Sequence, residues 1–194
     1  MKKIISLFAC LFIGSANAAL ITYADTDLAS GNPVTVGGTT LTTSTAGGSI
    51  GFIGSGTFTG LWLGGNDTSG SYSLDFSQTV SSIEIEFDAL SDVGALPVET
   101  LFNFGTNNGA AAIGYVNQFG TIFDGITITS TENDGQGIIS FVGLFDSFSF
   151  DHDQGAQSGF VIERIVVNTV DVQVPEPTTL ALLGLGLAGI GFSR

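Results

Sequence analysis

The clearest potential for chemistry lies in two carboxylates that flank the single histidine of the chain, in the run Asp151-His152-Asp153-Gln154-Gly155. Ca²⁺ is a hard cation that prefers oxygen ligands, and a glycine allows a loop to bend around it. Asp151 and Asp153 are therefore candidate calcium ligands, with Asp146 or Asp124 as further oxygen donors. The spacing does not fit an EF-hand loop, because the fifth and sixth positions lack the Asp or Asn and the Gly that this loop requires. The alternative interpretation is an acidic turn between two strands.

The single tryptophan opens a second candidate site, Trp62-Leu63-Gly64-Gly65-Asn66-Asp67. An indole ring presents a large apolar surface that can stack on a sugar ring. Asn66 and Asp67 are suited to bind sugar hydroxyl groups, and Tyr72 and Tyr115 are further rings that could stack. This segment predicts carbohydrate binding at the end of a strand. The alternative interpretation is that Trp62 packs in the core.

No combination of residues predicts catalysis. A Ser-His-Asp triad would have to use His152, and the run Gly47-Gly48-Ser49-Ile50-Gly51 lacks the strand-to-helix context of a nucleophile elbow. Glu84 and Glu86 could in principle hydrolyse a glycoside, but catalytic carboxylates flank a sugar across a cleft, whereas residues two apart on a strand share one face. We therefore predict a protein that is not an enzyme and has no catalytic residues.

The charge balance excludes whole classes of partner. Of 194 residues, 4 are Lys or Arg and 18 are Asp or Glu, for a formal net charge of −14. So few basic side chains cannot neutralise a phosphate backbone, which argues against nucleic acid as a partner. One Cys and one His cannot assemble a Cys/His zinc site, so no cofactor other than calcium is expected. The length suits one domain of ordinary size.

Short runs of alternating apolar and polar residues fill the body of the chain and predict β-strands. In the clearest run, residues 80–88, Ile83, Ile85 and Phe87 share one face and the carboxylates between them share the other. Turns rich in Gly and Asn separate the runs. About ten short strands predict that residues 19–173 form one all-β domain, an antiparallel β-sandwich of jelly-roll type. Further strands are expected at residues 56–63, 71–76, 125–129, 147–150 and 160–167.

Residues 1–18 have the three parts of a secretory signal peptide. Two lysines precede an apolar run of about ten residues, and Ala16-Asn17-Ala18 supplies the small side chains that signal peptidase requires. We expect signal peptidase to cut between Ala18 and Ala19.

Residues 174–194 form a second targeting segment. Val174-Pro175-Glu176-Pro177 interrupts regular structure, because each proline fixes φ and lacks an N–H donor. The apolar residues 178–192 follow, which would form a helix about 22 Å long and insert as a short transmembrane segment. Arg194 ends the chain. This order of Pro-Glu-Pro, apolar stretch and basic end resembles the PEP-CTERM sorting signal of Gram-negative bacteria.

The resemblance implies recognition by exosortase, a membrane-embedded protease that would cut near Pro175-Glu176-Pro177. The chain would be anchored in the inner membrane in transit and would then reach the cell surface or the extracellular matrix. Proteins of this class accompany exopolysaccharide production and biofilm formation. We therefore expect an exported, exosortase-processed matrix or surface protein with a non-catalytic, structural role. The alternatives are a carbohydrate-binding module, assisted by calcium, that holds the exopolysaccharide, and a secreted glycoside hydrolase.

Overall fold

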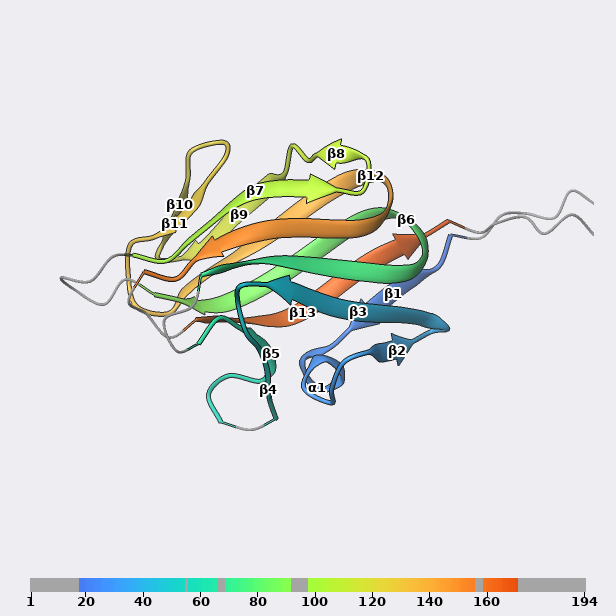
Figure 1. The fold of residues 1–194 in the computed structure, drawn as a ribbon, viewed down its shortest axis with the longest axis horizontal. Helices are drawn as coiled ribbons and strands as arrows, with labels where there is room; N and C mark the ends of the chain where they lie inside the picture. The colour runs from blue at the N-terminus through green and yellow to red at the C-terminus, as the bar shows by residue number, and fades with distance from the viewer. Residues whose placement is uncertain (1–17, 55, 66–68, 92–97, 156–158, 171–194) are drawn as a thin grey trace, which may run out of the picture. The chain divides into compact units, whose positions relative to one another are not determined.

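The computed structural model describes residues 18–54, 56–65, 69–91, 98–155 and 159–170. The predicted signal peptide up to residue 17, and the predicted sorting signal with its transmembrane helix, lie outside these residues. The described part is almost wholly β-structure, with one short helix, α1 (Asp25–Leu28) (Figure 1). Its strands are β1 (Leu20–Tyr23), β2 (Val34–Val36), β3 (Thr39–Ala46), β4 (Ile50–Ile53), β5 (Gly60–Leu63), β6 (Gly70–Leu90), β7 (Thr100–Thr106), β8 (Gly109–Ala110), β9 (Gly114–Phe119), β10 (Thr121–Phe123), β11 (Ile128–Ser130), β12 (Gly135–Asp153) and β13 (Phe160–Thr169).

Two long strands, β6 and β12, organise the fold. They pair antiparallel along almost their whole length, from Gly135 opposite Leu90 to His152 opposite Gly70. The register shifts twice between Val142 and Ser147, near the middle of the pair. Irregularities of this kind bend a strand and increase its twist. On one side of the shifts β3 and β7 flank the pair, and on the other side β13 and β9 do so.

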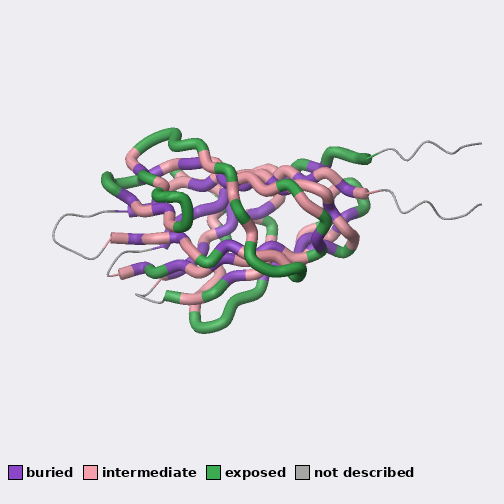
Figure 2. Tube along the Cα trace, turned by 90° about the horizontal axis from the view of Figure 1, so that it is seen from above, coloured by how far each residue is buried: buried purple, intermediate pink, exposed green. Residues whose placement is uncertain are grey.

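The strands therefore form one continuous antiparallel sheet that folds over into two layers, with β6 and β12 shared between them. We call these the β3 layer and the β13 layer. The rings of Phe150, in the β3 layer, and Phe160, in the β13 layer, have centroids 6.1 Å apart, so the layers share a core. Figure 2 shows the buried positions alternating along the strands. The all-β prediction is confirmed, whereas the strand order does not confirm a jelly roll, which stays a prediction.

The alternation read from residues 80–88 is confirmed side chain by side chain. Ile83, Ile85 and Phe87 are at most 2% exposed, and Glu84 and Glu86 lie on the outer face. Aromatic residues supply much of the shared core, because each ring buries a large apolar area. The aromatic side chains that are fully buried are Tyr23, Tyr72, Phe87, Phe145, Phe148 and Phe160.

The prediction of a strand at 125–129 is wrong in its first half. The strand β11 begins at Ile128, and Ile126 is 74% exposed instead of facing the core. One carboxylate oxygen of Asp124 accepts hydrogen bonds from the backbone N–H groups of Ile126 (2.9 Å) and Thr127 (2.7 Å). A short polar side chain that bonds the backbone ahead of it holds a turn in place of a strand.

The first and last strands of the domain lie side by side, since β1 pairs antiparallel with β13. The N–H group of Thr169 donates to the carbonyl of Ala19 (2.9 Å), and the N–H group of Ala19 donates to the Thr169 hydroxyl (3.3 Å). The N–H group of Val170 then donates to the carbonyl of Thr79 (3.1 Å). The points where the chain enters and leaves the domain are therefore adjacent and hydrogen-bonded to each other (Figure 1).

Candidate functional site

The predicted calcium ligands lie on the outer face at the end of β12. Asp151 accepts a hydrogen bond from the amide of Asn103 (2.6 Å), and Asp153 accepts one from the hydroxyl of Ser69 (2.8 Å). The bond from Ser69, followed by one from the Gly155 N–H group, lowers the pKa of Asp153. Hydrogen bonds thus hold both side chains on one face of the strand, as their two-residue spacing predicts.

The described residues contain no group of three His, Cys, Asp or Glu side chains that could hold a metal ion. Asp124, named as a further donor, uses one oxygen to hold its own turn, and this hydrogen bonding lowers its pKa. Asp146 is exposed, and its backbone N–H donates to Asn107. One oxygen of Asp151 and one oxygen of Asp153 already accept hydrogen bonds, and calcium binding stays a prediction.

Between these two carboxylates, His152 turns inward and is 1% exposed. Its Nε2 atom lies 3.5 Å from Oε1 of Glu99, which is fully buried, and neither ring nitrogen has a hydrogen-bond partner. The Glu99 carboxylate accepts hydrogen bonds from the backbone N–H groups of Ser91 (2.6 Å) and Gly159 (2.8 Å). Two backbone donors therefore compensate the burial of this carboxylate.

A third buried polar residue, Gln154, completes the cluster. The side-chain Oε1 atom of Gln154 accepts a hydrogen bond from the Gly65 N–H group (2.9 Å), and the backbone N–H group of Gln154 donates to the Ser69 hydroxyl (3.0 Å). We call Glu99, His152 and Gln154 the buried hub. The hub joins three connections at one end of the sheet, because Gly65, Ser91 and Gly159 each border a segment outside the described residues. Sequence reasoning identified His152 but missed Glu99 and Gln154.

The predicted sugar-binding segment borders this hub. Trp62 lies on β5 and is partly exposed, and Asn66 and Asp67 lie outside the described residues. Gly159 gives the indole room, since a Cβ at that position would lie 3.0 Å from Trp62 Nε1. Part of the Trp62 residue is therefore exposed, which packing in the core alone does not explain.

The two tyrosines named with Trp62 differ in burial. Tyr72 is 1% exposed, and its hydroxyl donates to the carbonyl of Ser49 (3.2 Å). Tyr115 packs against Phe87, with ring centroids 6.4 Å apart, and its hydroxyl bonds that of Thr121 (2.5 Å). Tyr72 therefore has no face open to a sugar, whereas Tyr115 is partly buried and its stacking role stays a prediction.

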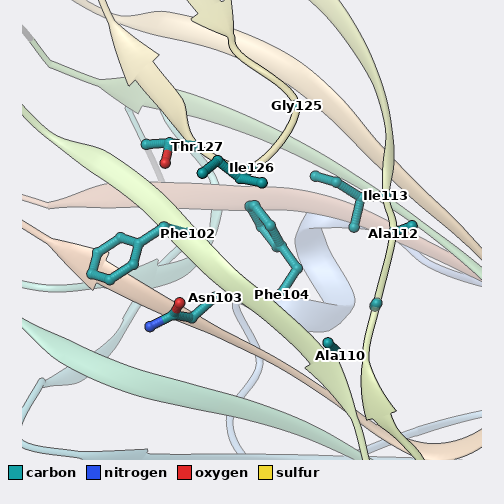
Figure 3. Close-up of a pocket in the computed structure, with 10 residues that line it drawn as sticks. Phe102, Asn103, Phe104, Ala110, Ala112, Ile113, Gly125, Ile126 and Thr127 are labelled. Carbon is teal, nitrogen blue, oxygen red and sulfur yellow. The ribbon is translucent and has the colours of Figure 1, made fainter.

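An apolar hollow of ≈ 580 Å³ lies beside β7 (Figure 3). The strand β11 pairs with β7 at residues 100–101 and β8 pairs with it at residues 105–106, which leaves the edge of β7 open between them. In Figure 3 Phe104 points into the hollow from β7, with Ile113 and Ile126 on its other walls. No pattern in the sequence predicted this hollow.

The two predicted processing sites fall at the ends of the domain. Ala18 and Ala19 are exposed at the start of the described residues, and Ala16 lies outside them. Signal-peptidase cleavage stays a prediction. No helix within the described part of the chain is long and apolar enough to cross a membrane.

Comparison with known proteins identifies one segment of the chain. Residues 173–194 match the family model of the PEP-CTERM protein-sorting motif, which includes Val174, Pro175, Glu176, Pro177 and Arg194. No curated protein and no solved structure gives a significant match to the chain. The chain therefore ends in a PEP-CTERM protein-sorting motif, the mark of an exported protein that is targeted to exosortase.

Proposed function

We propose that this chain is a non-catalytic structural protein of the cell surface or extracellular matrix, associated with exopolysaccharide. It is exported through its signal peptide, is held in the inner membrane in transit, and is released or transferred when exosortase cuts the sorting motif. The match of residues 173–194 to the sorting motif is the observation that carries this proposal.

The fold supports delivery by this route. Within the described residues, Val170 donates the last backbone hydrogen bond, and the apolar segment begins at residue 178. The seven residues 171–177 between them can span at most about 25 Å at full extension. The folded domain would therefore stand close to the bilayer while residues 178–192 are inserted. A rigid, closed domain end is suited to this position, because Ala19 and Thr169 are tied together there.

Two features support a role without catalysis. His152 is the single histidine of the chain and is almost fully buried, so a dissolved substrate would not reach its ring. Arg164 binds Glu84 (3.1 Å) and Glu86 (2.7 Å) on the outer face of the sheet, as expected of a solvated polar face.

Replacement of the three residues Pro175, Glu176 and Pro177 by alanine in the native host tests the proposal. We expect the variant to accumulate in the membrane fraction and to disappear from the surface and the medium. Alanine at Thr178 and Thr179 is the matched control and should leave delivery unchanged. Equal surface delivery of the motif variant and the unaltered chain would refute the proposed route.

The partly exposed indole of Trp62 favours carbohydrate binding as a second function. Because Trp62 is the single tryptophan, its fluorescence reports on this site alone. A Trp62→Ala variant should lose retention in gels that contain the host exopolysaccharide, and Phe52→Ala on the neighbouring strand β4 should not. Removal of calcium with EDTA, and the Asp153→Asn variant, test whether calcium assists. Unchanged fluorescence and retention in the presence of the polysaccharide would exclude this function.

A further inference from the structure

The free edges of the sheet are protected unequally. Beyond its pairing with β2, β3 is covered by Asn32, whose side chain donates to the Thr43 carbonyl (2.6 Å) and accepts from the Thr43 N–H group (2.8 Å). The strand β7 carries a bulge at Asn103, where φ is +51°. Covered backbone groups and bulges are two devices that stop an edge strand from pairing with another chain.

The strand β9 is protected less, because its one register irregularity lies between Asn117 and Phe119 and leaves residues 114–117 in regular pairing with β12. Among the described residues it pairs with β12 alone, and all but one of its six residues are exposed. Its sequence, Gly-Tyr-Val-Asn-Gln-Phe, contains neither a charge nor a proline. Val116 is 58% exposed and Phe119 is 52% exposed. An exposed edge strand without charges or proline is a template for pairing with a further strand.

The distribution of charge indicates which partner fits this edge. Residues 110–123 carry no charged side chain, in a chain with a net charge of −14. Val116 lies opposite Ile138 of β12, which in turn lies opposite Glu86 of β6. Glu86 is the nearest carboxylate across the sheet in this direction, and both Arg164 and Gln118 donate hydrogen bonds to it. Two acidic domains repel each other over most of their surface, but the two β9 edges can meet without bringing like charges together.

An antiparallel edge is also complementary to itself. Two copies related by a two-fold axis place identical strands antiparallel, so each copy supplies the backbone donors and acceptors that the other requires. We propose that β9 pairs with β9 of a second copy of this chain, so that the β13 layer continues across a two-fold dimer. This inference does not depend on the proposed route of export.

Sedimentation equilibrium of the protein purified from its native host, at several salt concentrations, tests the proposal. We expect a dimer whose dissociation constant falls as salt rises from about 20 to 200 mM, because salt screens the repulsion between the acidic domains. Because Val116 is exposed on β9, a Val116→Asp substitution would add a negative charge to the shared edge from each copy and should raise the dissociation constant at least about tenfold. The matched control is Phe52→Asp on the edge strand β4, which should leave it unchanged.

Amide hydrogen exchange of the unaltered protein provides a second test, which does not require that the Val116→Asp variant folds. In the unaltered protein, exchange of the β9 amides should slow as protein concentration rises, while exchange in β4 stays constant. A monomer at every salt and protein concentration would overturn the proposal. So would a dimer that Phe52→Asp disrupts and Val116→Asp does not.

Discussion

At the residue scale, Glu99 carries the largest energetic consequence. Its buried carboxylate accepts two backbone N–H groups from separate connections, those of Ser91 and Gly159. A Glu99→Ala substitution would leave both donors buried without an acceptor, so we expect the free energy of unfolding to fall by about 2–5 kcal/mol in urea denaturation. The exposed Asp146→Ala is the control and should change it by less than about 0.5 kcal/mol. If both variants lost the same free energy of unfolding, the buried hub would not stabilise the connections that it contacts.

Glu163 gives the stability a dependence on pH. Burial raises the pKa of Glu163, and the negative charges of Asp88, Glu86 and Asp25 raise it further. A carboxyl group with a raised folded-state pKa favours folding below its unfolded-state pKa, and this contribution is lost as the pH rises through the folded-state pKa. The ionised side chain therefore opposes folding at pH 7.

A Glu163→Gln substitution should raise the free energy of unfolding at pH 7, by no more than about 1 kcal/mol as for other partly exposed charges. The gain should vanish below about pH 4, where the carboxyl groups of the unfolded chain are themselves protonated. Urea denaturation at both pH values measures the effect, with the exposed Glu132→Gln as control. A gain of equal size at both pH values would rule out the carboxylate charge as its cause.

The candidate sites could be predicted from the sequence only in part. The alternation around His152 places Asp151 and Asp153 on one face, and this is a local property that the sequence displays. Glu99 is distant from His152 in the chain and gives no local signal, because its burial depends on how β7 and β12 pair. The stacking role expected of Tyr72 is wrong for the same reason, since a ring on a strand points to the core or to solvent according to the layer that covers it.

At the scale of the elements, the sequence predicts the strands well and their lengths poorly. Residues 71–76 and 80–88 read as two strands, but both belong to β6. The alternation changes phase between Val80 and Ile83, which resembles a break, and the register of the β6–β12 pair shifts on both sides of Val80. Only the pairing with β12 joins the two runs, and that pairing involves residues far along the chain.

Gly60 fixes how closely β5 approaches β13. Its φ is +144°, and a Cβ there would overlap the carbonyl oxygen of Ile162. A Gly60→Ala substitution should therefore lower the free energy of unfolding by more than about 2 kcal/mol. At Gly54 a Cβ would meet no atom within 4 Å, so Gly54→Ala is the matched control and should be neutral or slightly stabilising. Thermal denaturation of the two variants measures the difference, and equal melting temperatures would contradict this account of the β5–β13 contact.

At the scale of the whole molecule, a folded β-domain precedes a PEP-CTERM sorting motif, and we expect a signal peptide before the domain. The tie between Ala19 and Thr169 brings the points where the chain enters and leaves the domain together. The buried hub and Trp62 belong to connections at the ends of β5, β6 and β12. A domain of this kind can be attached to, or released from, a surface without disturbing its core.

The most direct test of the central claim is the intact mass of the protein recovered from the native cell surface and the medium. The account predicts a chain that begins at Ala19 and ends near Pro175, with or without an added glycan. A mass that still includes residues 180–194 would contradict it, because the sorting motif would then be an uncleaved anchor.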